Sequence, residues 1–520
     1  DKISEILKSE PTVRSSLVAQ QGVLQIIEVI EFSKLKNDKN INTILSIIYD
    51  MCKDQSQIKE NFCLLGGIPP IMKFLNPDVD IISRHYAVNV LTEICTKSLD
   101  NTQMFIACNG LSAICQVLKY DIDQEWESII SAVTTISDYF GTQKATQKAD
   151  LCRLFMKARL FKPMSEVLLH FATSELFKQN EEAQKTISLL CELFNDFSQA
   201  DSKVKLALSS PDIMENIVST MYTTKDGVRV LTLEDILLLS KTIKFTAMDA
   251  ETRDNLTDSG VMEMTCEMLK YDFGKGEKKD QTMLNLLIHS NLIMLLNDMC
   301  KLSSQVSKKR IGIVADSRLL PHLVEYMDKE SELKTMSLSV IMELYNVVKS
   351  DKVAMKKLID DNLIDLYLKN LTNHYWGSKA ITAISTLLNE DQQEIEPLIT
   401  KESALENFRT GIEKVDQDNA QTYISTFSSM VRKSKKFTNA LINAELISIL
   451  INKFWYMHKQ NTFSQVPTLL LEFILAMFQS EASNVKHLKS PEMKSIIAGY
   501  IGSDNVKQQT NATKILEYFK

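Results

Sequence analysis

The sequence has little glycine and proline, with 14 Gly and 10 Pro among 520 residues, about half or less of average usage. Both residues interrupt helices, so their scarcity predicts a chain that is helical throughout. The sequence also lacks a run of about 18 uncharged apolar residues, the length that a membrane-spanning helix needs. Its first residues, DKISE, do not resemble a signal peptide. We therefore expect no membrane insertion and a cytoplasmic location.

Metal-binding and nucleic-acid-binding patterns are also missing. The nine Cys form no C-x-x-C pair, and the seven His form no H-x-x-x-H or H-E-x-x-H pattern. Each Cys lies within an apolar helical pattern, which is typical of small buried side chains in a reducing compartment. The formal net charge of −7 and pI of about 5.7 argue against nucleic acid as the main ligand, because phosphate-binding proteins concentrate Lys and Arg. We expect no structural metal and no cofactor.

Catalytic motifs are absent apart from one triplet. There is no P-loop, no G-x-S-x-G and no G-x-G-x-x-G after a strand. Asp272-Phe273-Gly274 spells the metal-binding triad of protein kinases, but the glycine-rich loop, the V-A-I-K lysine and the H-R-D motif do not precede it. The triplet is interpreted as a turn at a helix end. The sequence therefore predicts a chain without catalytic activity of its own.

The sequence instead contains a repeated helical unit, seen most clearly from Asn61. A short helix ends at Gly66-Gly67, and a second helix runs from Ile68 to Leu75 with a proline in its first turn, where the missing N–H is tolerated. A long third helix follows Asn76-Pro77-Asp78 and has apolar residues at helical spacing. Short helix, glycine turn, medium helix and long helix is the plan of an armadillo repeat.

The unit recurs along the chain. Equivalent polar positions of the third helices fall 43, 45, 54, 106, 45, 43 and 43 residues apart, at Asp50, Glu93, Asp138, Glu192, Asp298, Glu343, Thr386 and Ser429. About 40 to 47 residues are expected for such repeats. We predict an all-α, right-handed superhelical armadillo/HEAT-type solenoid of about eleven repeats, in which third helices line a concave binding wall.

This solenoid is expected to be one domain over residues 1–520, because each unit covers the apolar face of its neighbour. The expected subdivisions are a partial capping repeat at 1–38, longer repeats at about 139–300 and a C-terminal cap at about 482–520. Inserted loops are predicted at Gly141–Lys148 and Gly274–Asp280.

The expected ligand is another protein. Nuclear-import adaptors present repeated Trp and Asn residues on their third helices, but the positions here read Asn89/Glu93 and similar pairs, so an import adaptor is not expected. Arginine forks and helix N-termini bind phosphate well, which singles out Arg84 and His85 at the start of a third helix. The alternative for every basic cluster is a solvated face. The candidates for peptide or phosphopeptide binding are Arg84, His85, Asn89, Glu93, Arg153, Lys157 and Arg159, with secondary basic candidates Lys308, Lys309, Arg310, Arg432, Lys433, Lys435 and Lys436.

Several short segments also resemble a known family. They are GGIP at 66–69, QMFIAC at 103–108, LCRL at 151–154, LPHL at 320–323, YW at 375–376 and NAL at 439–441. In this order and spacing they are similar to the armadillo region of plant MAP kinase kinase kinase epsilon, which is related to the fungal kinases of the mitotic-exit and septation-initiation pathways.

The resemblance implies a non-catalytic C-terminal region of a larger Ser/Thr kinase. It implies recruitment to a scaffold at the spindle pole body or centrosome, and by this analogy we expect the ligand to be a phosphorylated scaffold peptide. Two alternatives stay open. One is an autoinhibitory or dimerisation module, with self-association, and the other is a standalone adaptor for basic peptides, which the acidic third-helix positions suggest.

Overall fold

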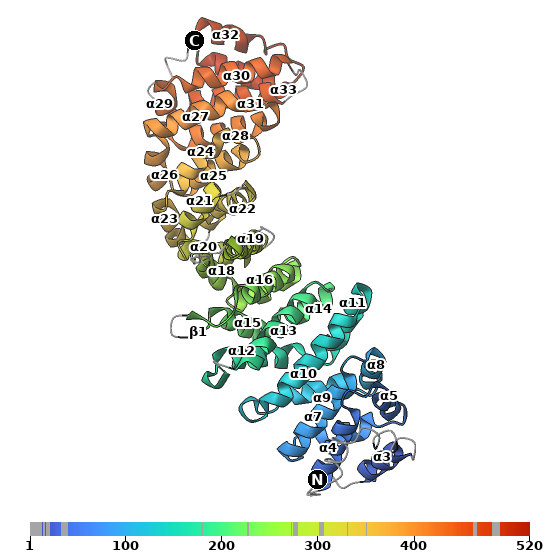
Figure 1. Cartoon of the computed structure of the whole chain (residues 1–520). Helices are drawn as coiled ribbons and strands as arrows, with labels where there is room; N and C mark the ends of the chain where they lie inside the picture. Colours follow the sequence, from blue (N-terminus) through green and yellow to red (C-terminus); the bar gives the residue numbers. More distant parts are fainter. Residues whose placement is uncertain are drawn as a thin grey trace. The chain divides into compact units, whose positions relative to one another are not determined.

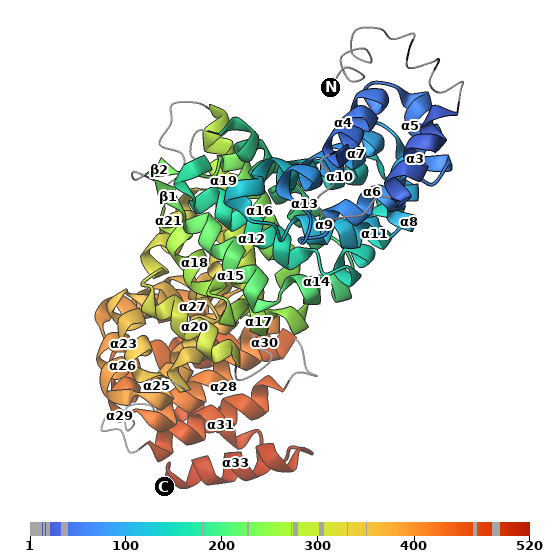
Figure 2. The same ribbon diagram turned by 90° about the horizontal axis from the view of Figure 1, so that it is seen from below.

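The computed structural model describes residues 13, 16, 21–32, 40–177, 180–225, 228–271, 273, 279–300, 306–329, 331–349, 351–460, 465–480 and 489–520. The chain groups into two compact units, Asp1–Leu295 and Leu296–Lys520 (Figures 1 and 2). The boundary falls inside one helix, α19 (Lys279–Cys300). We describe each unit by itself, and the single domain expected from the sequence stays a prediction.

The repeat predicted from Asn61 forms as three helices. Its first helix ends at Leu64, and Gly66 in the following turn has a φ of +81°, a left-handed conformation that favours glycine. A Cβ on Gly67 would lie 2.3 Å from the Phe62 ring, so the turn also needs glycine for close packing. The side chain of Asp80 caps the third helix by accepting a hydrogen bond from the backbone N–H of Ser83. The helices are α5 (Ser56–Leu64), α6 (Ile68–Met72) continued by η1 (Lys73–Leu75), and α7 (Ile81–Cys95).

The first unit repeats this plan, with one short hairpin inserted. Two helices precede the first complete repeat, α3 (Gly22–Phe32) and α4 (Asn40–Cys52). The later repeats are α8 (Leu99–Ala107), α9 (Gly110–Val117) and α10 (Ile122–Thr142); α11 (Ala145–Lys157), α12 (Phe161–Thr173), η2 (Glu175–Phe177) and α13 (Glu181–Ser198); α14 (Ser202–Leu208), α15 (Pro211–Tyr222), the antiparallel strands β1 (Thr224–Lys225) and β2 (Val228–Arg229), and α16 (Leu233–Ala247); and η3 (Ala250–Thr252), α17 (Arg253–Asp258), α18 (Val261–Leu269) and α19.

The second unit continues the same series of helices. They are α20 (Val306–Asp316), α21 (Leu320–Lys329), α22 (Ser331–Ile341) and η4 (Leu344–Lys349); α23 (Lys352–Asp360), α24 (Leu363–Lys369), η5 (Asn370–Thr372) and α25 (Gly377–Glu390); α26 (Gln392–Ile399), α27 (Glu402–Lys414) and α28 (Gln417–Lys433); α29 (Lys435–Asn443), α30 (Leu446–Gln460) and α31 (Val466–Gln479); and α32 (Pro491–Ala498) with α33 (Val506–Glu517). The described helices form complete three-helix repeats with an incomplete group of helices at each end, which agrees with the predicted count of about eleven repeats. The all-α armadillo-type fold is confirmed.

The third helices of successive repeats pack against one another. In the first unit α4, α7, α10, α13 and α16 lie side by side in this order, and in the second unit α25, α28, α31 and α33 do the same (Figure 1). We call each set the third-helix layer of its unit. Between the helices lies a continuous core, in which buried rings such as Phe140, Phe155 and Phe197 meet edge to face. The layers therefore present their polar residues on a repeated and rigid backbone.

The loop predicted at Gly141–Lys148 is wrong. Helix α10 runs through Gly141 to Thr142, and α11 begins at Ala145, so two residues connect them. The extra length of this repeat lies in its first two helices, because α11 and α12 have 13 residues each, whereas α8 and α9 have 9 and 8. In the other predicted loop, Gly274–Lys278 lies outside the described residues.

Of the D-F-G triplet the structure describes only Phe273, because Asp272 and Gly274 lie outside the described residues. The Phe273 ring lies 5.1 Å from the Tyr271 ring and 4.9 Å from the Arg229 guanidinium. Phe273 is therefore a packing residue between the β-hairpin and α19.

Among the described residues, one segment, Gln281–Cys300 of α19, is long and apolar enough to cross a membrane by length and composition. Half of it is buried inside the protein. Its Asn291 accepts a hydrogen bond of 2.9 Å from Lys244 Nζ, and its Asn297 accepts one of 2.7 Å from Ser339 Oγ. Both asparagines therefore pair with polar side chains of the protein.

Candidate protein-binding surface

The third-helix layer of the first unit is strongly acidic. Its five helices, α4, α7, α10, α13 and α16, carry twelve acidic and four basic side chains. The acidic residues are Asp50, Glu93, Asp123, Glu125, Glu127, Asp138, Glu181, Glu182, Glu192, Asp196, Glu234 and Asp235. Four of the fourteen predicted site residues, Arg84, His85, Asn89 and Glu93, lie on one of these helices, α7.

Arg84 is a structural residue, which corrects its predicted role in binding phosphate. The side chain is buried, and its Nε and Nη2 donate to the two carboxylate oxygens of Glu125 at 2.9 and 2.5 Å. Its Nη1 donates to the carbonyl oxygens of Pro77 and Val79, and the guanidinium lies 4.8 Å from the Tyr120 ring centre. Every edge of the guanidinium is thus engaged inside the protein. The sequence showed a basic residue at a helix start but could not show that a carboxylate from the next repeat reaches it.

The remaining candidates on α7 contact each other or their neighbours. His85 lies between Asn89, 2.9 Å away, and the Ser128 hydroxyl, 3.2 Å away. The Glu93 carboxylate pairs with the buried Lys59 ammonium at 2.6 Å and accepts a hydrogen bond from the backbone N–H of Asp54. His85 and Asn89 therefore keep part of their surface exposed, whereas the charge of Glu93 is neutralised.

The three residues of the predicted cluster Arg153, Lys157 and Arg159 have different surroundings. Arg153 pairs with Asp150 at 2.9 Å and with Asp201 of the next repeat at 2.5 Å. Helix α11 ends at Lys157, and Arg159 follows it in a left-handed conformation with φ of 58°, so Arg159 does not lie on the helix that holds Arg153 and Lys157. Lys157 and Arg159 are exposed, and no ion pair is found for either within the described part of the chain.

The secondary basic candidates lie in the second unit. The Arg310 side chain is buried and donates to the carbonyl oxygen of Met299, so it does not offer its charge to a ligand. Lys309 is exposed, and the Lys308 side chain lies outside the described residues.

The other secondary cluster lies where α28 ends and α29 begins. Arg432, Lys433, Lys435 and Lys436 are all exposed. Lys436 pairs with the buried Glu396 carboxylate at 3.3 Å, while Arg432 and Lys433 have no ion pair among the described residues. This cluster is the more accessible of the two.

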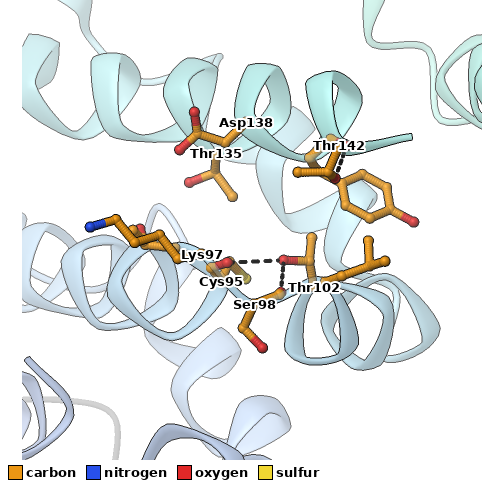
Figure 3. A pocket seen from close by; sticks show the side chains of 10 residues that line it. Cys95, Lys97, Ser98, Thr102, Thr135, Asp138 and Thr142 are labelled. Atoms are coloured by element: carbon orange, nitrogen blue, oxygen red, sulfur yellow. Dashed lines mark hydrogen bonds between the residues drawn. The ribbon is translucent and has the colours of Figure 1, made fainter. Parts of the chain in front are cut away.

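A pocket of about 190 Å³ opens between α7 and α10 in the first unit (Figure 3). One wall is the α10 face formed by Thr135, Asp138, Tyr139 and Thr142, which recur at helical spacing. The opposite wall is the end of α7 and the start of α8, with Cys95, Thr96, Lys97, Ser98, Leu99 and Thr102.

The pocket exists because α10 is longer than α7. Thr135 of α10 donates to Thr92 of α7 at 3.3 Å, which sets the register of the two helices. With this register, α7 ends at Cys95 while α10 continues beyond Asp138 to Thr142. The last turn of α10 therefore extends past its neighbour, and α8 closes the space below it.

The pocket carries unpaired charge at its rim. Asp138 and Lys97 are exposed, and neither has an ion-pair partner within the described residues. Figure 3 shows both toward one end of the pocket, with Thr142 toward the other. Burial raises the pKa of Tyr139, so this phenol stays neutral at physiological pH. Asp138 was predicted as a wall residue, but Lys97, Leu99 and Tyr139 were missed, because only the difference in helix lengths brings them together.

Fungal relatives of the chain align with about three quarters of its length. It is 24% identical over 386 residues to the cytokinesis protein sepH of Emericella nidulans, which covers 74% of this chain and 27% of that protein. It is 20% identical over 401 residues to cell division control protein 7 of Schizosaccharomyces pombe, covering 77% and 35%. It is 28% identical over 158 residues to MAP3K epsilon protein kinase 1 of Arabidopsis thaliana, covering 30% and 11%. The chain thus spans about a quarter to a third of the length of the fungal relatives.

Similar solved structures include an engineered protein, with a TM-score of 0.49, 12% identity and coverage of 87% of this chain and 98% of that one. They also include a designed armadillo repeat protein, with a TM-score of 0.36, 14% identity and coverage of 52% and 99%. No family model matches the chain. The resemblance predicted from the short motifs is confirmed: the chain is a homologue of fungal cytokinesis and cell-division-control proteins and of the plant MAP3K epsilon kinases.

Proposed function

We propose that this chain is the non-catalytic, protein-binding region of a Ser/Thr kinase that acts in cytokinesis, and that it recruits the kinase to a scaffold at the spindle pole body or centrosome. Two findings support a regulatory or scaffold region, namely the armadillo-type fold and the relationship to cytokinesis proteins and kinases. The single observation that carries protein binding is the third-helix layer of the first unit, where an open pocket adjoins an unpaired carboxylate.

The charge of this layer indicates which charge its ligand should carry. Twelve acidic and four basic side chains repel a phosphate group and attract lysine and arginine. The arginine best placed to bind phosphate, Arg84, already has both carboxylate oxygens of Glu125 as partners. We therefore favour an unphosphorylated, basic scaffold segment on the first unit.

A phosphorylated scaffold segment is the second candidate, and it would use the second unit. There, Arg432 and Lys433 are exposed and unpaired among the described residues, next to the N-terminus of α29. Charge-assisted hydrogen bonds from such residues are the usual means of holding a phosphate.

The recruitment function is tested by expressing this chain fused to a fluorescent protein, without any kinase domain, in dividing fungal cells that carry a spindle-pole marker. We expect the fusion to colocalise with the marker during mitosis. A diffuse signal at every stage contradicts recruitment. Adding the purified chain to the separate kinase domain distinguishes the autoinhibitory alternative, because recruitment predicts unchanged kinase activity and autoinhibition predicts its loss.

A further inference from the structure

We infer that the pocket at the end of α7 receives one apolar side chain of an extended basic peptide segment, and that a lysine or arginine next to that side chain pairs with Asp138. This inference rests on the proposed protein-binding function and names the chemistry of its ligand. The ligand is therefore a partner segment in which an apolar residue is flanked by basic ones.

The size and walls of the pocket fit an apolar side chain. Its volume of about 190 Å³ exceeds the ~30 Å³ that one water molecule occupies in the liquid, so a leucine, methionine or phenylalanine side chain would displace several waters. Leu99 lines the pocket and is 42% exposed, which leaves apolar surface to be covered by a ligand. The Cys95 side chain and the Tyr139 ring complete the apolar part of the wall.

The hydroxyl groups of the wall are largely satisfied within the protein. Thr102 Oγ1 donates to the carbonyl oxygens of Cys95 and Ser98, and Thr96 Oγ1 donates to that of Thr92. Thr142 Oγ1 donates to the carbonyl oxygen of Tyr139. An apolar group entering the pocket therefore leaves these hydrogen bonds in place.

The charges around the pocket select a cation beside that apolar group. Asp138 is exposed at the rim without an ion-pair partner among the described residues. Glu192 on the next third helix, α13, is also exposed and also has no ion pair within that part of the chain. The end of α7 contributes the negative end of a helix dipole and the start of α8 the positive end of another, so the carboxylates set the preference for a cation. Lys97 is the one basic residue that lines the pocket. Its single positive charge is smaller than the summed negative charge of the acidic residues in the surrounding third-helix layer.

Binding of synthetic peptides to the whole chain tests this inference. The probe is a short fluorescein-labelled peptide with one leucine followed by three lysines or arginines between glycine and serine residues. Three matched peptides replace the leucine by glycine, replace the basic residues by glutamate, or add a phosphoserine beside the leucine. Fluorescence anisotropy measures each Kd at low and at physiological salt.

We expect the basic leucine peptide to bind most tightly. Asp138→Lys reverses the rim charge, and Thr142→Trp fills the pocket from an exposed position, so each should weaken binding about tenfold, which corresponds to about 1.4 kcal/mol. The matched control is Glu215→Lys, the same charge change at an exposed and unpaired position on α15, outside the layer. It should leave the Kd unchanged within about twofold. Circular dichroism and thermal unfolding confirm that all three variants fold.

Several results overturn the inference. They are binding of the wild-type chain to none of the peptides, equal binding by Asp138→Lys and Thr142→Trp, and tighter binding of the glutamate or phosphoserine peptide. Sedimentation that shows self-association lost in Asp138→Lys would make a second copy of the chain the occupant and would also overturn it.

The outcome is separable from that of the proposed function. If the peptides fail while the fluorescent fusion still reaches the spindle pole, the pocket assignment is wrong and recruitment stands. If the fusion stays diffuse, recruitment is wrong whatever the peptides show.

Discussion

The two units share one backbone plan but differ in the charge of their third helices. In the first unit these helices carry twelve acidic and four basic side chains. In the second unit α22, α25, α28, α31 and α33 carry five acidic and six basic ones. Stacking constrains the faces that meet neighbouring repeats, and it leaves the outer faces free to vary. Ligand preference in such a protein can therefore differ between units without a change of fold.

One charged pair that joins neighbouring repeats in each unit shows how much exposure matters. Arg84–Glu125 in the first unit is buried, whereas Lys379–Glu343 in the second is 2.8 Å long with its lysine side chain 50% exposed. Taking one partner from a buried pair leaves an uncompensated charge, but an exposed charge is solvated by water. The same type of contact should thus have very different effects on stability in the two units.

The largest expected effect tests this difference directly. Arg84→Ala should destabilise the first unit by about 3–5 kcal/mol because it leaves Glu125 buried and unpaired, while Lys379→Ala should cost about 1 kcal/mol or less. Hydrogen exchange measured by mass spectrometry on α7, α10 and α25 would report each unit separately, which suits a chain whose units need not unfold together.

A double variant separates charge from packing. Arg84→Met combined with Glu125→Leu should recover most of the lost protection, because apolar residues of similar volume often replace a buried pair without loss. Equal effects of Arg84→Ala and Lys379→Ala would contradict the claim that the buried pair contributes more to stability than the exposed pair.

A smaller effect should be common to both units, because it concerns the inward faces. A Cβ on Gly377 would lie 2.7 Å from the Leu371 carbonyl oxygen and 2.8 Å from the Tyr423 hydroxyl, and a Cβ on Gly110 would lie 2.6 Å from Phe105. Gly377→Ala and Gly110→Ala should each cost about 1–3 kcal/mol through overpacking, measured by thermal unfolding.

The control for these glycines is Gly312 inside α20, where a Cβ would meet nothing within 4 Å. Gly312→Ala should stabilise the second unit by roughly 0.5–1 kcal/mol, because alanine favours the helix. Destabilisation by all three substitutions would show that helix geometry, rather than close approach between groups, sets the requirement for glycine.

The smallest expected effect is pH-dependent. Hydrogen bonding from Arg153 lowers the pKa of Asp201. The contribution of the Asp201 carboxylate to stability is therefore present above the pKa of an unfolded aspartate, about 3.9, and is lost as the pH falls through the lower folded value. Both side chains are at least a third exposed, so Asp201→Asn should cost less than about 1 kcal/mol at pH 7, and this loss should diminish as the pH falls toward 2. Denaturant unfolding across this range measures it. A larger loss at low pH than at pH 7 contradicts the assignment.

The second unit offers a matched carboxylate. Burial raises the pKa of Asp416, but hydrogen bonds from Asn419 and His374 outweigh it, and the net pKa is lowered. The contribution of Asp416 to stability should therefore be present above the pKa of an unfolded aspartate, about 3.9, and should be lost as the pH falls through the lower folded value, as for Asp201.

The fold class and the relatives of the chain could be predicted from the sequence alone. The glycine turn at Gly66, the proline after it and the recurring polar position near Glu93 reflect local rules of helix geometry, which act within a few turns of the chain. The cysteines followed the same rules, and eight of the nine are buried. Short motifs in a fixed order were enough to identify the relatives.

Only the tertiary structure decided which side chains are available to a ligand. Arg84 is buried because Glu125, 41 positions later, reaches it from the next repeat, and Arg159 leaves its helix face because α11 ends before it. The pocket arises from the difference in length between two packed helices and belongs to no single segment. Charge and spacing along the chain do not contain these facts, because they depend on the register between repeats, which long-range packing sets.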